Sequence, residues 1–138
     1  MRTKRHGRCI GFRTTIVFCL LTLLSILLAG CGKPGVFDGS RVSNEDGFWM
    51  EYTILNKEET ADLQLTEGER LQLVFAHTAG NVDVVVSRRD KEPIYRGTMQ
   101  ENADFILTVP ETGTYRISVT GHQAKGKVSF TRMAAKTE

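Results

Sequence analysis

Residues 61–75, ADLQLTEGERLQLVF, contain the pattern that decides the fold of this chain. Apolar and polar side chains alternate on both sides of a short polar turn at Glu67-Gly68-Glu69. Alternation of this kind places one face of a strand in a core and the other face in water. The stretch therefore predicts two strands joined by a glycine turn.

The same period of two extends in both directions along the chain. Residues 48–55 alternate so that Phe48, Met50, Tyr52 and Ile54 are expected to face the core. Further apolar runs lie at residues 82–86, 94–95, 105–109, 115–119 and 128–130. Turns at Gly80-Asn81, at residues 110–113 and at Gly126 are expected to separate them. Seven or eight short strands without a long helical pattern predict an all-β fold, a single antiparallel, jelly-roll-like β-sandwich.

The first 30 residues have a different character. A basic head carries five Lys or Arg residues and no acid, and an apolar run follows from Ile16 to Leu28. The run ends in Leu28-Ala29-Gly30-Cys31. Counted to Gly30 it covers 15 residues, whereas a membrane-spanning helix needs roughly 20. The segment is therefore predicted to be a secretory signal peptide.

The four residues that end the run resemble the lipobox of bacterial lipoproteins. The resemblance implies that the Cys31 sulfur receives a diacylglyceryl group and that cleavage falls between Gly30 and Cys31. Cys31 would then be the first residue of a protein that is anchored to the cell membrane and faces outside the cytoplasm. Anchoring in an outer membrane is the other option. The alternative is an ordinary secreted protein, cut near Ala29, in which Cys31 is a free thiol.

Composition shifts again after Cys31. Residues 32–47 contain four glycines, one proline and no sustained periodicity, which favours a flexible tether. Fully extended, these residues would reach about 50 Å. We therefore predict a signal at 1–30, lipidated Cys31 and tether at 31–47, the sandwich at 48–133 and a C-terminal tail at 134–138.

Charge and cysteine content exclude several functions. Of 18 basic residues five precede Cys31, so 13 remain beside all 16 acidic residues, a net charge of −3. This balance predicts no nucleic-acid partner. Cys9 and Cys19 also precede Cys31, so no cysteine is left for a disulfide or a thiolate metal site.

Residue types that carry catalysis or bind metals lack the necessary spacing. His77 and His122 have no metal-ligand pattern, and the nucleophile elbow Gly-x-Ser-x-Gly is absent. No enzyme activity, cofactor or metal site is predicted. Four acids could offer oxygen ligands to Ca²⁺ but match no loop motif, and solvated positions are favoured for Asp83, Asp90, Glu92 and Asp104. The mixed-charge run at residues 88–92 is predicted to form a solvated hairpin loop, or the rim of an interface.

Two aromatic residues fall out of phase with the expected core. Trp49 alternates with Phe48 and Met50, and Tyr95 follows Ile94. An outward aromatic on a sandwich can stack on a sugar ring or anchor a partner. Trp49 and Tyr95 are therefore the candidate binding surface. The alternative is that Trp49 packs beneath the tether, against Val36 or Phe37, or that a bulge turns it inward.

Tyr115 lies two residues after a glycine turn. This position predicts a corner tyrosine whose hydroxyl binds a nearby backbone group. Gly68, Gly113 and Gly126 are predicted to be turn residues with positive φ.

Three segments resemble the bacterial pre-peptidase C-terminal domain, namely residues 65–73, 82–86 and 110–119. Members of that family are non-catalytic accessory domains, although no protease is attached here. With its lipobox, the chain is also similar to small lipoproteins of Gram-positive bacteria. These resemblances imply a location and a fold, not an activity. The absence of a catalytic constellation, on a scaffold often used for adhesion, favours a non-catalytic envelope module that binds a protein or a glycan. A structural accessory subunit without a ligand is the alternative, and an enzyme is less favoured.

Overall fold

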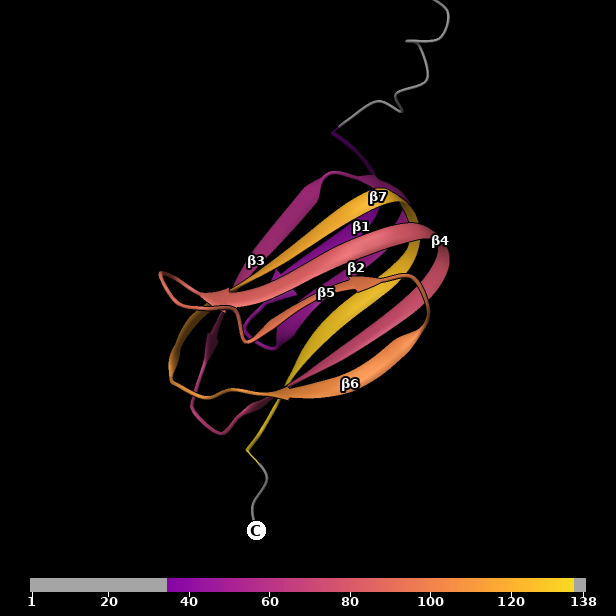
Figure 1. Cartoon of the computed structure of the whole chain (residues 1–138). Helices are drawn as coiled ribbons and strands as arrows, with labels where there is room; N and C mark the ends of the chain where they lie inside the picture. Colours follow the sequence, from indigo (N-terminus) through magenta and orange to yellow (C-terminus); the bar gives the residue numbers. More distant parts are fainter. Residues whose placement is uncertain (1–34, 136–138) are drawn as a thin grey trace, which may run out of the picture. The chain divides into compact units, whose positions relative to one another are not determined.

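The computed structural model describes residues 35–135 (Figure 1). Within this range it has seven strands: β1 (Val36–Asn44), β2 (Gly47–Asn56), β3 (Glu58–Leu65), β4 (Arg70–Arg88), β5 (Tyr95–Met99), β6 (Ala103–Thr108) and β7 (Gly113–Met133). No helix in the described range is long and apolar enough to cross a membrane. The predicted signal peptide, Gly30 and Cys31 lie outside the described residues, so cleavage and lipidation remain predictions.

Two long strands, β4 and β7, organise the fold. They pair with each other antiparallel over almost their whole length, from Arg70 opposite Met133 to Arg88 opposite Tyr115. Both strands bend midway, where the register shifts between His77 and Asn81. Figure 1 shows the paired ribbon curling back on itself at the β4 label.

Each half of this ribbon carries a different set of partners. On one side of the bend the strand order is β1-β2-β7-β4-β6, and we call this layer A. On the other side the order is β3-β7-β4-β5, which we call layer B. Buried side chains from both layers form one hydrophobic core. The predicted antiparallel all-β sandwich is confirmed.

Glycines make the two bends possible. Gly80 and Gly126 have φ values of 72° and 147°. A Cβ at Gly80 would lie 2.4 Å from the Gln123 carbonyl oxygen, and one at Gly126 would lie 2.1 Å from that of Ala76. The sequence predicted turns that end strands here, whereas the chain bends and continues the same strand.

The predicted tether at residues 31–47 is wrong over most of its length. Residues 36–44 form β1, which pairs with β2 from Val36 opposite Asn56 to Asn44 opposite Gly47. The sequence of β1 shows no clear alternation of apolar and polar residues, because β1 is an edge strand with exposed polar side chains on both faces. The turn that joins β1 to β2 includes a hydrogen bond from the Asp46 N–H to Asn44 Oδ1 at 2.9 Å.

Arg41 of β1 closes the side of the sandwich. Its guanidinium pairs with Glu59 of β3 at 3.2 Å, hydrogen-bonds the Thr60 carbonyl, and lies 5.2 Å from the centre of the Phe48 ring. A charged side chain turned inward on an edge strand discourages pairing with another sheet.

The core-facing phase of β2 is as predicted up to Tyr52 and then changes. Phe48, Met50 and Tyr52 are buried. A register shift follows between Tyr52 and Leu55, so Leu55 is fully buried while Ile54 is 42% exposed. The predicted inward orientation of Ile54 is therefore wrong, because a bulge moves the next residue to the core face.

The predicted corner tyrosine is confirmed. Tyr115 is 1% exposed, and its hydroxyl donates to the Glu111 carbonyl oxygen at 2.8 Å. Positive φ is also confirmed for Gly68 and Gly126. Gly113 does not have a positive φ, because it begins β7 in extended conformation.

Candidate functional site

Trp49 lies on the outer face of layer A. It is half-buried, whereas its neighbours Phe48 and Met50 face the core, so its predicted outward orientation agrees with the structure. The strand register places Val42 beside it on β1, Ser129 on β7, and Val74 beyond Ser129 on β4. The result is an apolar row across four strands that is interrupted by one small hydroxyl residue.

A polar row lies next to this apolar one. Ser40, Glu51, Lys127 and Ala76 are aligned across the same four strands. Lys127 Nζ pairs with Glu51 Oε2 at 3.0 Å, and both side chains are more than half exposed. An exposed pair of this kind contributes little to stability, so its groups are available to a ligand.

Both rows line a continuous groove. A hollow of about 320 Å³ surrounds Trp49, Val42 and Val74, and one of about 450 Å³ extends toward Thr53 and Thr78. The two hollows share four lining residues, Ser40, Glu51, Ala76 and Lys127. Of these four residues, Ser40 and Ala76 have small side chains, which leave space open beside Glu51 and Lys127.

The indole of Trp49 leans over Gly47 on the sheet surface. A Cβ at Gly47 would lie 2.9 Å and 3.0 Å from the Cζ2 and Cη2 atoms of the ring. An aromatic ring held against a sheet in this way offers an apolar surface at little cost in side-chain entropy. The groove thus combines an aromatic surface, aliphatic neighbours and groups that donate and accept hydrogen bonds.

Sequence reasoning identified Trp49 but missed most of its surroundings. Val42 fell in the predicted tether. Val74 interrupts the alternation between Leu73 and Phe75, and three apolar residues in a row were a signal that one of them faces outward. The alternative contacts of Trp49, with Val36 or Phe37, are replaced by the contact with Val42, since neither residue lines the groove.

The predicted outward orientation of Tyr95 is wrong. Tyr95 pairs with Val86, which is fully buried, and therefore shares its core-facing side. Its ring centre lies 5.0 Å from that of Phe105, at the edge where β5 and β6 cover the core. The strand β5 begins at Tyr95, and its pairing with β4 sets which residues face the core. Trp49 and Tyr95 do not form one surface.

The two histidines lie in the long strands β4 and β7, near the bends. His122 Nε2 is 2.8 Å from Asp83 Oδ2, and the Thr98 hydroxyl donates to Asp83 Oδ1 at 2.5 Å. The Thr98 hydrogen bond first, and His122 second, lower the pKa of Asp83. His77 is half-buried, and its backbone N–H donates to Asn102 Oδ1 at 2.8 Å.

The acids weighed as Ca²⁺ ligands are dispersed. Asp83 is occupied by Thr98 and His122, and Asp104 accepts a hydrogen bond from Gln72 Nε2 at 2.9 Å. Asp90 and Glu92 lie in the connection between β4 and β5. Residues 35–135 contain no group of three or more His, Cys, Asp or Glu side chains that could hold a metal ion.

No protein-family model and no curated protein matches the chain, so its likeness to the pre-peptidase C-terminal domain stays a prediction. A structure described as "CBM4 structure and function" matches with a TM-score of 0.41 and 10% identity, over 72% of this chain and 80% of that one. A chain of the glycosylation-associated Gap123 complex from Streptococcus agalactiae has a TM-score of 0.39 and 13% identity, over 75% of this chain. This chain spans only 42% of that protein.

The Drosophila melanogaster CENP-C cupin domain gives a TM-score of 0.38 with 11% identity, over 88% of this chain and 98% of that one. TM-scores this low do not define a shared function.

Proposed function

We propose that this chain is a lipid-anchored, non-catalytic module of the bacterial cell envelope that binds a glycan chain in the Trp49 groove. The observation that carries the proposal is the outward Trp49 in a shallow groove that crosses β1, β2, β7 and β4. The anchor is supported by the lipobox-like Leu28-Ala29-Gly30-Cys31. Two acyl chains on one cysteine suffice for stable membrane attachment, whereas one chain does not.

The shape of the groove supports a chain-like ligand. Sites for compact small molecules are concave and enclose most of the ligand, while this groove lies open on a sheet face. A sugar ring has an apolar face that can stack on Trp49 and hydroxyls that can bind polar groups. Glu51, Lys127 and Ser129 offer such groups beside the ring.

Binding of envelope glycans by the purified full chain in detergent tests the proposal. We expect wild-type protein to bind soluble fragments of wall glycan in isothermal titration calorimetry, and Trp49→Ala to weaken binding at least tenfold, because stacking is lost. Ile54→Ala is the matched control, since Ile54 is an exposed apolar residue that does not line the groove. Equal affinities of wild type and Trp49→Ala would overturn the assignment of the groove.

The anchor is tested separately by intact mass of the membrane-fraction protein. The expected mass is that of the chain from Cys31 plus a diacylglyceryl group, and Cys31→Ala should lose both the added mass and membrane retention. A soluble, unmodified wild-type protein would show that the anchor is wrong and that Cys31 is a free thiol. This result would leave the glycan groove untouched.

A further inference from the structure

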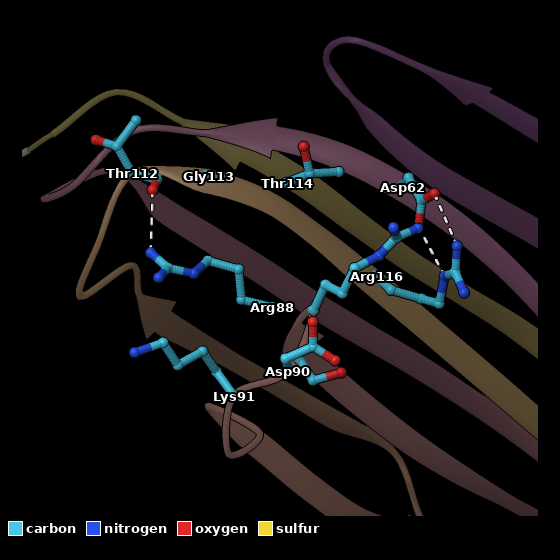
Figure 2. A pocket seen from close by; sticks show the side chains of 10 residues that line it. Asp62, Arg88, Asp90, Lys91, Thr112, Gly113, Thr114 and Arg116 are labelled. Atoms are coloured by element: carbon cyan, nitrogen blue, oxygen red, sulfur yellow. Dashed lines mark hydrogen bonds and ion pairs between the residues drawn. The ribbon is translucent and has the colours of Figure 1, made fainter.

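A second recess, remote from the Trp49 groove, lies where β4 ends and β7 begins (Figure 2). It has a volume of about 690 Å³ and is lined by the β4–β5 connection, the start of β7 and Asp62 of β3. The mixed-charge run at residues 88–92 contributes most of its charged side chains. The solvated loop that the sequence predicted there is thus one wall of a recess.

The recess concentrates positive charge on an acidic domain. Residues 35–135 contain 11 Lys and Arg residues and 15 Asp and Glu residues. Four of those cations line the recess, Arg88, Arg89, Lys91 and Arg116, against two acids, Asp62 and Asp90. A cleft that gathers one sign of charge attracts ligands of the opposite sign.

Two of the cations are held in place by neighbouring groups. Arg116 makes two hydrogen bonds to Asp62, at 2.9 Å and 3.1 Å. Arg88 pairs with Glu111 at 2.6 Å and donates to the Thr112 carbonyl at 3.1 Å. Figure 2 shows the Arg88 guanidinium directed toward Thr112 and the Arg116 guanidinium toward Asp62. These interactions orient the two guanidinium groups beside the recess.

Gly113 makes room for the stem of Arg88. A Cβ on this residue would lie 2.8 Å from Arg88 Cδ. Since Gly113 has no positive φ, an alanine there is compatible with the backbone but displaces the arginine.

The remaining two cations are less engaged, although, after the larger effect of Arg116, the charge of Arg89 is close enough to Asp62 to help lower the pKa of that carboxyl. Within residues 35–135, the side chains of Arg89 and Lys91 make no hydrogen bond and no ion pair. Both line the recess from the β4–β5 connection. In Figure 2 the head groups of Lys91 and Arg88 lie on the same side of the recess, below Thr112.

We propose that this recess binds an oxyanion group, a phosphate or a carboxylate carried by an envelope molecule. Arg89 and Lys91 are the contacting cations, and Arg88 is the positioned third donor. Guanidinium groups match the paired oxygens of both anions, and such charge-assisted hydrogen bonds are stronger than neutral ones. The negative charge of Asp90 repels an anionic ligand, so this residue limits the affinity of the site. The proposal concerns a site separate from the Trp49 groove and does not depend on it.

Calorimetric titration of the purified full chain in detergent, at about 50 mM salt to limit screening, tests the site. The probes are pyrophosphate for the phosphate source and oligogalacturonate for the carboxylate source, and tighter binding of one identifies the source. Arg89→Ala and Lys91→Ala should each weaken binding at least fivefold. Lys57→Ala is the charge-matched control, because Lys57 is remote from the recess. Lys57 precedes β3, whereas the recess adjoins the start of β7, which pairs with the other end of β3.

Two further variants separate a built site from general charge attraction. Asp90 has φ = 59°, a conformation that asparagine adopts readily, so Asp90→Asn should fold and tighten binding several-fold. Gly113→Ala keeps every charge but moves Arg88, and should weaken binding. No binding of either probe at 10 mM, or an equal loss in Lys57→Ala and Lys91→Ala, would overturn the proposal.

Discussion

At the scale of single residues, two buried tyrosines are expected to affect stability in opposite ways when each is replaced by phenylalanine. The Tyr115 hydroxyl donates to Glu111, whereas the Tyr52 hydroxyl is buried without a hydrogen-bond partner in residues 35–135. Burial raises the pKa of Tyr52 to about 12. A net hydrogen bond contributes about 1 kcal/mol, and an unpaired buried polar group costs a similar amount or more.

We therefore expect Tyr115→Phe to lower the free energy of unfolding by about 1 kcal/mol, and Tyr52→Phe to leave it unchanged or raise it by about 1 kcal/mol. For a domain of this size, 1 kcal/mol corresponds to about 4–8 °C in Tm. Thermal unfolding of the two variants measures both effects, and each serves as the control for the other. A loss of stability in Tyr52→Phe equal to that in Tyr115→Phe would contradict the distinction.

Residue-level prediction from the sequence succeeded where the strand phase was anchored by several residues. Trp49 was placed correctly because Phe48, Met50 and Tyr52 fix the phase of β2 around it. Tyr95 was misplaced because the apolar pair Ile94-Tyr95 gives no phase of its own. Its orientation is fixed instead by pairing with Val86, a contact between segments that the sequence does not show.

At the scale of elements, the sequence indicated strands well and their ends poorly. Both β4 and β7 were divided at glycines that act as bends. The difference between a turn and a bend depends on whether the two halves continue to pair with the same partner, and β4 and β7 do so. The edge strand β1 was missed for a related reason, since pairing with β2 rather than its own apolar pattern makes it a strand.

The carboxylate of Glu69 links two distant elements and should make stability depend on pH. It accepts hydrogen bonds from Arg132 of β7 at 2.7 Å and 3.0 Å and from the Thr66 N–H at 2.7 Å. The Arg132 hydrogen bonds hold the pKa of Glu69 below its ordinary value. Unfolded Glu69 therefore binds a proton more readily than folded Glu69, and the stabilisation is present above the unfolded pKa of about 4.3.

We expect this contribution to disappear as the pH falls through the lowered pKa of folded Glu69. The midpoint urea concentration of unfolding should fall between pH 6 and pH 3 in both proteins. The fall should be smaller in Glu69→Gln than in wild type. Glu67→Gln is the control, because the Glu67 side chain forms no ion pair with residues 35–135. An unchanged pH dependence in Glu69→Gln would show that the link to Arg132 contributes nothing.

At the scale of the whole molecule, β1 changes how far the domain can stand from a membrane. If Cys31 carries the proposed lipid, only residues 32–35 separate it from the first strand at Val36. Four residues reach at most about 14 Å, compared with about 50 Å for the tether that the sequence predicted. One end of the sandwich is then held beside the lipid headgroups.

The strand register shows which end this is. Val36 pairs with Asn56 and lies beside the connection to β3 at Lys57, whereas Glu67 follows the opposite end of β3. The eight residues of β3 separate the two positions by about 26 Å at 3.3 Å each. Lys57 is therefore expected near the headgroups and Glu67 farther out. The oxyanion recess, which adjoins the start of β7, lies toward the Glu67 end.

Fluorescent labels on Lys57→Cys and Glu67→Cys, in vesicles with a nitroxide headgroup lipid, measure this orientation. Because Cys31 would be blocked by lipid and Cys9 and Cys19 removed with the signal, each variant carries one reactive thiol. The label at residue 57 should be quenched strongly and the label at residue 67 weakly. Inserting sixteen Gly and Ser residues after Gly32 should reduce the difference, since a long linker lets the domain move away and rotate. Equal quenching at both positions with the native linker would contradict an end-on orientation, because a short anchor at one end of a rigid sandwich cannot hold both ends at the same height unless the domain lies flat.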